Sequence, residues 1–166
     1  MRKIIKYILI SISLLILIYI VYIFVFLYNF TNDVYRDSEN YIINIPFQDL
    51  AVDIYSFKKS NPKYYLITTN EKGEKIIYQD NSSTKHYHVF FYFEDIDLTI
   101  QCLLNPIDDK NSLFGLYAVS KGTRFASWQT INTNELTGKE NRAIKKKFET
   151  EILNNLGKWK HKRWYN

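Results

Sequence analysis

The stretch "KHYHVFFYFEDIDLTIQCLL", residues 85–104, carries the strongest fold signal in this chain of 166 residues. If residues 94–97 form a four-residue loop, Phe93 faces Leu98 and Val89 faces Cys102 across a β-hairpin. Because side chains alternate between the two faces of a strand, one face then collects only apolar and aromatic residues and the cysteine. We predict that this face packs in the core; its members are Tyr87, Val89, Phe91, Phe93, Leu98, Ile100, Cys102 and Leu104.

Two further hairpins are predicted along the chain. In "SLFGLYAVSKGTRFASWQTI", residues 112–131, a tight turn at Lys121 and Gly122 sets Trp128 opposite Gly115, where its ring can cover the glycine. Earlier in the chain, "KYYLITT" joins "KIIYQ" through residues 70–73, a type I turn followed by a glycine bulge. The second half of the molecule is therefore expected to be built on antiparallel strands.

Two segments have helical spacing. Over residues 139–156, Ile144, Phe148, Ile152 and Leu156 recur every four residues, and Gly157 is a natural stop. Residues 46–59 are ambiguous, and we interpret them as a short helix or turn that runs into a strand. Strands followed by one amphipathic helix predict an α+β fold, a mainly antiparallel sheet with a C-terminal helix packed on it. Which face of the sheet this helix covers is left open by the pattern.

The N-terminal stretch "YILISISLLILIYIVYIFVFLY", residues 7–28, contains no charge, Gly, Pro or Ala. As a helix it would be roughly 33 Å long, enough to cross a hydrocarbon core of about 30 Å. A cleaved signal peptide has a shorter apolar core and a small-residue cleavage site, whereas the first alanine here is Ala51. The segment is therefore predicted to be a transmembrane signal anchor that stays in the lipid bilayer.

The charges around this segment predict its orientation. Arg2, Lys3 and Lys6 precede it, and no positive charge follows until Arg36. The positive-inside rule then places the chain in the cytoplasmic (inner) membrane as a single-pass protein, with the N-terminus in the cytoplasm and the C-terminal domain outside, in the periplasm. We divide the chain into a cytoplasmic stub (1–6), the anchor (7–28), a tether (29–40) and an extracytoplasmic α+β domain (41–166).

The formal net charge of +5 is unevenly distributed. Residues 33–138 contain ten Lys and Arg against fourteen Asp and Glu, whereas residues 139–166 contain nine against three. The outer domain therefore has an acidic body and a basic C-terminal part. A domain outside the cytoplasmic membrane is not expected to bind nucleic acid. With the single Cys102, the domain cannot form an internal disulfide and must be held by packing.

Residue patterns that carry chemistry are weak. His86 and His88 share a strand face with Glu94, but no third histidine or cysteine is placed near them, so solvated histidines are favoured over a zinc site. Acids in the predicted turns fit backbone capping better than calcium binding; they are Asp95, Asp97, Asp108 and Asp109. No serine lies in a nucleophile elbow, and Cys102 lies in an apolar strand. We expect no catalytic residue, metal or cofactor, and hence no enzyme.

A protein partner is the remaining expectation for the outer domain. The face opposite the predicted core carries His88, Phe90 and Tyr92, a mixed aromatic patch of the kind found at interface centres. The acids Glu94, Asp95 and Asp97 beside it would steer a basic partner. If the C-terminal helix covers this face instead, the aromatic residues are buried and serve the fold.

The C-terminal stretch "GKWKHKRWYN", residues 157–166, interleaves aromatic and basic residues. One interpretation is contact with anionic lipid headgroups or an acidic partner; the other is an edge strand whose charges discourage further pairing. The residues concerned are Lys158, Trp159, Lys160, Lys162, Arg163, Trp164 and Tyr165.

Together these patterns predict a membrane-anchored extracytoplasmic binding protein of a bacterial envelope. Its most concrete form is an immunity- or inhibitor-type protein that neutralises a toxin or enzyme there. The alternative is an accessory or assembly subunit of an envelope membrane complex. A hydrolase with an unrecognised site is the third hypothesis.

Overall fold

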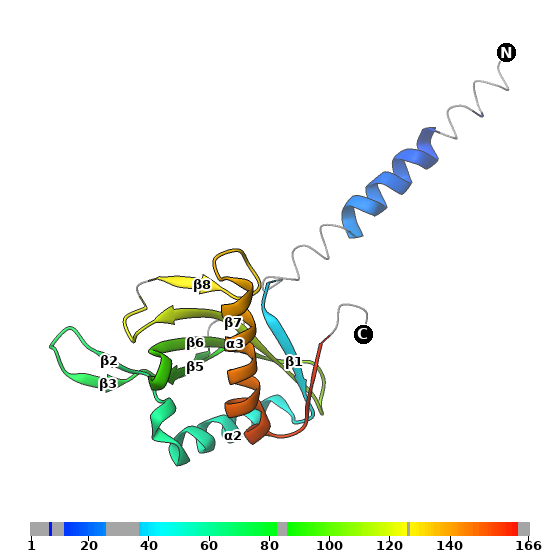
Figure 1. Ribbon diagram of the computed structural model, residues 1–166. Helices are drawn as coiled ribbons and strands as arrows, with labels where there is room; N and C mark the ends of the chain where they lie inside the picture. The colour runs from blue at the N-terminus through cyan, green and yellow to red at the C-terminus, as the bar shows by residue number, and fades with distance from the viewer. Residues whose placement is uncertain (1–6, 8–11, 26–36, 83–85, 126, 163–166) are drawn as a thin grey trace. The chain divides into compact units, whose positions relative to one another are not determined.

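The computed structural model describes residues 7, 12–25, 37–82, 86–125 and 127–162 (Figure 1). The chain divides into two compact units, Met1–Arg36 and Asp37–Asn166. In the first unit, residues 12–25 form a helix with mostly exposed side chains. The predicted anchor also includes residues 8–11 and 26–28, which lie outside the described residues. Over the described parts of the chain, no helix combines the length and apolarity needed to cross a membrane.

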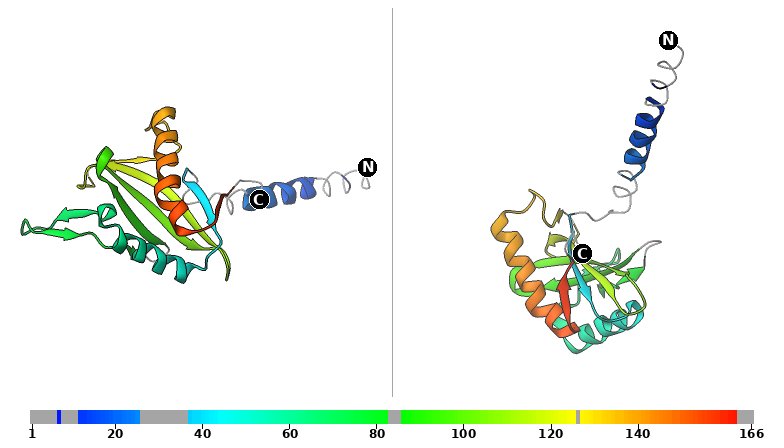
Figure 2. Two further views of the ribbon diagram at one scale, coloured as in Figure 1. Left: turned by 60° about the horizontal axis from the view of Figure 1, so that its bottom comes forward. Right: turned by 90° about the vertical axis from the view of Figure 1, so that its right-hand side faces the viewer.

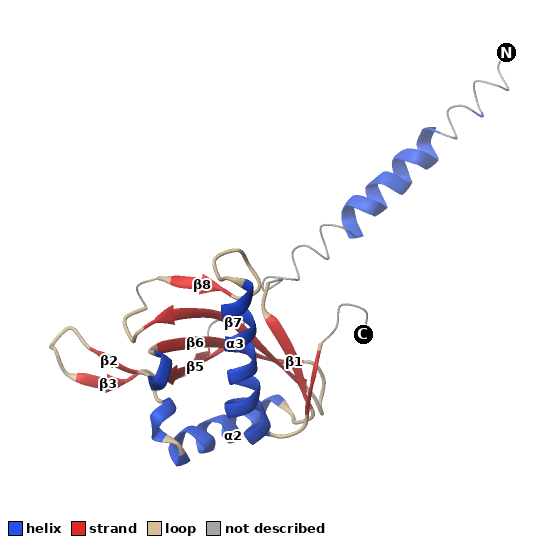
Figure 3. Cartoon of the chain, viewed as in Figure 1, coloured by secondary structure: helices blue, strands red, loops and turns tan. Residues whose placement is uncertain are grey.

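The second unit is α+β with a mainly antiparallel sheet, as predicted (Figure 3). Its described part contains a seven-stranded sheet in the order β4-β5-β6-β7-β1-β9, with β8 pairing to β7 beside β1. These strands are β1 (Glu39–Ile43), β4 (Asn81–Ser82), β5 (Tyr87–Phe93), β6 (Leu98–Pro106), β7 (Ser112–Lys121), β8 (Trp128–Thr130) and β9 (Trp159–His161). Glu39 and Asn40, which were predicted to belong to the tether, lie in β1. Tether residues 29–36 are outside the described residues.

The predicted register of the 85–104 hairpin is confirmed. Phe93 pairs with Leu98 and Val89 with Cys102, and a 3₁₀ turn at Glu94–Ile96 followed by the left-handed residue Asp97 closes the loop. On the predicted core face, six residues are buried, and Tyr87 and Leu98 pack partly buried against them. Cys102 is fully buried, and burial raises the pKa of its thiol well above the usual value.

The register predicted for the 112–131 hairpin is wrong. Trp128 pairs with Ser120 instead of Gly115, because a longer loop replaces the tight turn at Lys121 and Gly122. Gly115 lies next to β1, and a Cβ built on it would approach the side-chain oxygen of Asn40 to 2.8 Å. The neighbouring strand β1, which is distant in sequence, therefore occupies the space that the prediction assigned to the tryptophan ring.

A third hairpin, also predicted, forms a separate two-stranded sheet. β2 (Ile67–Thr69) pairs with β3 (Lys75–Ile77) through residues 70–73. Gly73 has φ of 81°, and its N–H donates to the carbonyl oxygen of Asn70, which gives the expected turn with a glycine in the left-handed region.

Of residues 46–59, all after Pro46 are helical, which corrects the predicted change into a strand. Helix α2 (Phe47–Ser60) buries Leu50, Ile54 and Lys58 on one side. Val52 and Tyr55, whose β-propensity favoured the strand, lie exposed on the other side. Asp49 in the first turn and Lys58 and Lys59 in the last turn also suit the helix dipole, so the tertiary contact and the charges outweigh the local strand preference.

The C-terminal helix is confirmed, with one wide turn inside it. α3 (Gly138–Phe148) begins at a capping box of Thr137 and Glu140, continues through a π turn (Glu149–Leu153) and ends in α4 (Asn154–Leu156). The apolar residues recur every four residues, whereas one turn of an α-helix contains 3.6 residues. Over three repeats the apolar residues would therefore move about 1.2 residues around the helix, away from the core. The π turn accommodates about one extra residue and so compensates for this difference, and Phe148, Ile152 and Leu156 are all buried in the core.

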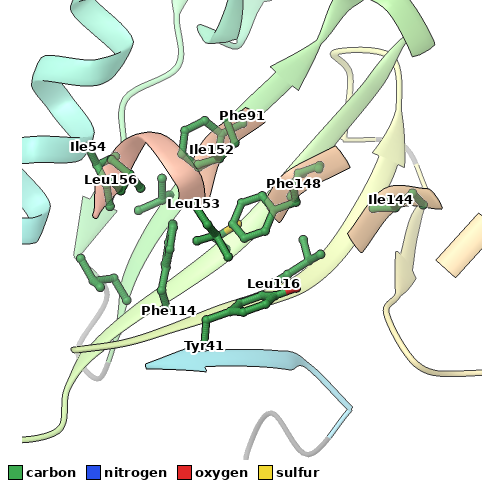
Figure 4. Packing of buried hydrophobic residues seen from close by; sticks show 14 of the residues in the cluster. Tyr41, Ile54, Phe91, Phe114, Leu116, Ile144, Phe148, Ile152, Leu153 and Leu156 are labelled. Atoms are coloured by element: carbon green, nitrogen blue, oxygen red, sulfur yellow. The ribbon is translucent and has the colours of Figure 1, made fainter. Parts of the chain in front are cut away.

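The core lies between the helices and one face of the sheet (Figures 2 and 4). The C-terminal helix covers the Val89 and Phe91 face, which resolves the alternative left open by the sequence. Phe148 contacts the rings of Tyr41, Phe91 and Phe114 with centroid distances of 5.8, 6.2 and 5.6 Å. These rings come from α3, β1, β5 and β7, so one side chain joins segments from both ends of the domain.

Candidate functional site

A pocket of about 610 Å³ opens where β5 turns into β6. Three segments line it: the 3₁₀ turn η1 (Pro62–Tyr64), the end of β5 with its turn, and the C-terminal helix around its π turn. Its charged and aromatic lining residues are Lys63, Tyr64, Tyr92, Phe93, Glu94, Asp95, Lys147 and Glu151. The pocket thus combines aromatic rings with both signs of charge.

Lys147 forms ion pairs with two acidic residues that line the pocket. Its Nζ lies 2.7 Å from Asp95 Oδ2 and 2.5 Å from Glu151 Oε1, and it lies over the ring of Phe93. Partial burial alone would lower the pKa of Lys147, but the hydrogen bonds to Asp95 and Glu151 outweigh it and raise this pKa. The same contact lowers the pKa of Asp95. Lys147 and Asp95 are therefore both charged at neutral pH.

Tyr64 forms the inner wall of the pocket. Its hydroxyl donates to Glu151 Oε2 at 2.9 Å, and its ring stacks on Phe57 and meets Phe93 edge-on. Burial, reinforced by the neighbouring Glu151 carboxylate, raises the pKa of Tyr64 to about 12. The phenol is therefore a hydrogen-bond donor that orients Glu151 toward Lys147.

Only some of the residues that were predicted from sequence to contact a partner lie at the pocket. Tyr92, Glu94 and Asp95 line the pocket, and the Tyr92 hydroxyl donates to Asp97 Oδ1 at 2.8 Å. Asp97 belongs to the same turn, with φ of 48°. Asp95 and Asp97 bond side chains, whereas Asp108 caps the backbone N–H groups of Lys110 and Asn111 as predicted for turn acids.

His88 and Phe90 lie away from the pocket, on the sheet face opposite the helix. Phe90 is only 6 % exposed, because Tyr78, Phe125 and Trp128 surround its ring with centroid distances of 5.0, 5.8 and 6.4 Å. The expectation that Phe90 forms an exposed patch is therefore wrong. The outer face of the sheet carries a small aromatic cluster of its own.

The histidines make local hydrogen bonds. His86 Nδ1 lies 2.7 Å from Asn105 Oδ1, and His88 Nδ1 lies 3.0 Å from Gln101 Nε2. Burial, with a smaller effect from His86, lowers the pKa of His88. Within the described ranges, no three His, Cys, Asp or Glu side chains are grouped so that they could hold a metal ion.

The C-terminal stretch forms the edge strand that one interpretation predicted. β9 pairs antiparallel with β1, and Trp159 packs edge-on against Tyr41. His161 lies between two carboxylates, with Nδ1 3.1 Å from Glu39 and Nε2 3.6 Å from Glu149. Arg163, Trp164 and Tyr165 lie outside the described residues.

Several pocket residues were not singled out from sequence. Lys63, Tyr64, Lys147 and Glu151 come from segments more than 80 residues apart, and no local pattern brings these segments together. One signal was present: Lys147 and Glu151 are four residues apart on a helix, the spacing of a side-chain ion pair.

The fold and the pocket define the second unit as an α+β domain that presents a charged, aromatic-lined pocket at one end of an antiparallel sheet. No protein-family model, curated protein or solved structure matches this chain.

Proposed function

We propose that this protein is a membrane-anchored binding protein of a bacterial envelope, whose outer domain holds a protein partner at the pocket. Its most concrete form is an immunity- or inhibitor-type protein that neutralises a toxin or an enzyme outside the cytoplasmic membrane. The long apolar segment of the sequence and the compact second unit that follows it support this form.

The anchor part of the proposal rests on residues 7–28. Twenty-two consecutive residues without a charge are the sequence signature of a membrane span, and the described portion at 12–25 is helical with exposed apolar side chains. The positive charges before the segment favour an outer position for the C-terminal domain.

The observation that carries the binding part is the acidic rim of the pocket beside Tyr92. Glu94 is exposed and makes no ion pair with another described residue, and the Asp95 side chain is 63 % exposed even though it contacts Lys147. Tyr92, which is partly exposed, supplies aromatic surface next to these acids. A lysine or arginine side chain of a partner can approach the carboxylates while its apolar stem packs on this ring.

Two residues on the rim have different expected roles. Tyr92 provides contact area and would contribute to the lifetime of the complex, as aromatic anchors do at interfaces. Glu94 acts at longer range and would raise the association rate in a salt-dependent way. The internal ion pairs of Lys147 hold the pocket walls in place around them.

A charge-reversal pair tests this proposal. The full chain with Glu94→Lys is purified from membranes after cross-linking, beside Glu71→Lys, which makes the same charge change at the exposed tip of the β2–β3 hairpin. The Glu94 variant is expected to lose a partner that the wild type and the Glu71 variant retain. Retention of the same partners by both variants would contradict a binding site at the pocket.

Replacement of residues 7–28 by an unrelated transmembrane segment separates the immunity form from an assembly subunit. Protection against the partner that persists with a foreign anchor supports a simple tether. Lost function with intact pocket binding supports an assembly role for the apolar helix itself.

A further inference from the structure

The lysines of the C-terminal edge strand lie on one face of β9. Trp159 and His161 both contact the ring of Tyr41, with centroid distances of 5.3 and 5.1 Å, and Tyr41 is buried on the helix side of the sheet. Because side chains alternate along a strand, Lys160 points to the opposite face. The ladder extends past both ends of β9, since Asn44 N–H donates to Lys158 and Lys162 N–H donates to Asn40.

Lys158, Lys160 and Lys162 therefore form a row of positive charges, spaced by about 6.7 Å along an exposed edge. All three residues are exposed, and none forms an ion pair with a described residue. Lys145 and Lys147 of α3 differ from this row, because they are engaged with Glu39, Asp95 and Glu151.

The strand pairing brings the end of this row next to the beginning of the domain. β9 runs antiparallel to β1, and the N–H of Lys162, which directly follows β9, donates to the carbonyl oxygen of Asn40, near the start of β1, at 2.8 Å. β1 is the first described strand after the apolar segment. Between Tyr28 and Glu39 there are only ten residues, which reach at most about 36 Å when fully extended.

We infer that the Lys158, Lys160 and Lys162 row binds the anionic phospholipid headgroups of the membrane in which the chain is anchored. This inference rests on the anchor of the proposed function. The reach of the connecting residues allows this row to come within a Debye length of the bilayer surface, where each lysine adds to the attraction of an anionic lipid layer. The contact fixes how the outer domain is oriented above the lipid.

The full chain in lipid nanodiscs provides the test. One set of discs contains phosphatidylcholine alone, and the other contains about one third phosphatidylglycerol. The rate of acetylation of each lysine by a water-soluble reagent is followed by mass spectrometry. Lys72, Lys75 and Lys110 serve as internal controls, because they are exposed and lie on the β2–β3 hairpin and the β6–β7 turn.

The three β9 lysines are expected to react at least about threefold more slowly in the anionic discs, and to recover at high salt, while the controls change little. Equal rates in both discs, or equal slowing of the control lysines, would contradict the headgroup contact and leave edge protection as the role of the row. A chain that does not remain in either disc contradicts the anchor, and with it both the proposed function and this inference.

Discussion

Lys58 and Asp80 form a buried ion pair that joins helix α2 to the edge of β5. The lysine Nζ lies 2.7 Å from both carboxylate oxygens, and Asp80 also accepts the backbone N–H of Phe90 at 2.9 Å. The lysine side chain is 5 % exposed and its ammonium lies over the ring of Phe91. Burial lowers the pKa of Lys58, and Asp80 opposes this effect without cancelling it.

The first prediction concerns this pair. Lys58→Ala leaves a carboxylate buried without its partner, and should reduce the free energy of unfolding by about 3–5 kcal/mol in denaturant titrations. The double variant Lys58→Met with Asp80→Asn should lose less, because no charge is buried and the amide oxygen can still accept from Phe90. Lys59→Ala, at the exposed neighbouring position, is the control and should change stability by less than about 0.5 kcal/mol. Equal losses at positions 58 and 59 would show that the pair contributes nothing.

The second prediction separates Phe90 from Tyr92. Phe90→Ala removes a buried ring from the Tyr78, Phe125 and Trp128 cluster and should cost about 3–5 kcal/mol in unfolding experiments. Tyr92→Ala removes a ring at the pocket rim with one exposed hydrogen bond, and should cost about 1 kcal/mol or less while weakening partner binding. Thermal melts run beside the binding assay distinguish the two effects. Comparable destabilisation by both variants would contradict the burial difference.

The third prediction concerns Cys102. Cys102→Ser places a hydroxyl in a fully buried apolar position and should destabilise the domain by about 1–3 kcal/mol. In the folded wild type, a thiol reagent should label Cys102 only as fast as the domain opens, and labelling should become fast in denaturant. Rapid labelling under native conditions would place Cys102 on the surface and overturn the hairpin register.

The fourth prediction is a pH dependence from Glu39. Partial burial would raise the pKa of this carboxyl, but the hydrogen bond and charge of Lys145 outweigh it, with Asn132 and His161 adding to the effect, so the pKa falls below its ordinary 4.5. A lowered folded-state pKa means that the stabilisation is complete above the unfolded value and is lost as the pH falls through the folded value.

Glu39→Gln should therefore reduce the loss of stability between pH 5 and pH 3, as measured by urea titrations at each pH. Glu71→Gln, at an exposed position without an ion pair among the described residues, is the matched control and should follow the wild-type curve. A Glu39 variant with the wild-type slope would mean that its contacts with Lys145 and His161 do not contribute.

Local patterns were sufficient for several parts of the fold. The β5–β6 register followed from alternation because a shift of one residue would expose Val89 and Phe91, and no other pairing collects the apolar set on one face. The C-terminal helix followed from the spacing of Ile144, Phe148, Ile152 and Leu156 and from Gly157 at its end. Both signals lie within about twenty residues of sequence, where strand and helix geometry relate neighbours directly.

Other parts depended on contacts between distant segments. Residues 47–59 are helical because the sheet offers Leu50 and Ile54 a surface to pack on, whereas the isolated sequence of this segment is equally compatible with a strand. Trp128 pairs with Ser120 because β1 takes the place beside Gly115. Phe90 is buried because the side chains of Tyr78, Phe125 and Trp128 cover it. The sequence of its own strand does not indicate this burial.

The sequence by itself determined the α+β class, the hairpin containing Cys102, the C-terminal helix, and the apolar and basic segments that motivate the membrane proposal, because these depend on short-range periodicity and composition. Only the tertiary structure decided that Lys147 meets Asp95 in a pocket and that Lys162 lies beside Asn40. These pairs are separated by 52 and 122 positions in the chain. Their proximity results from how the whole core packs, and a local sequence pattern does not encode it.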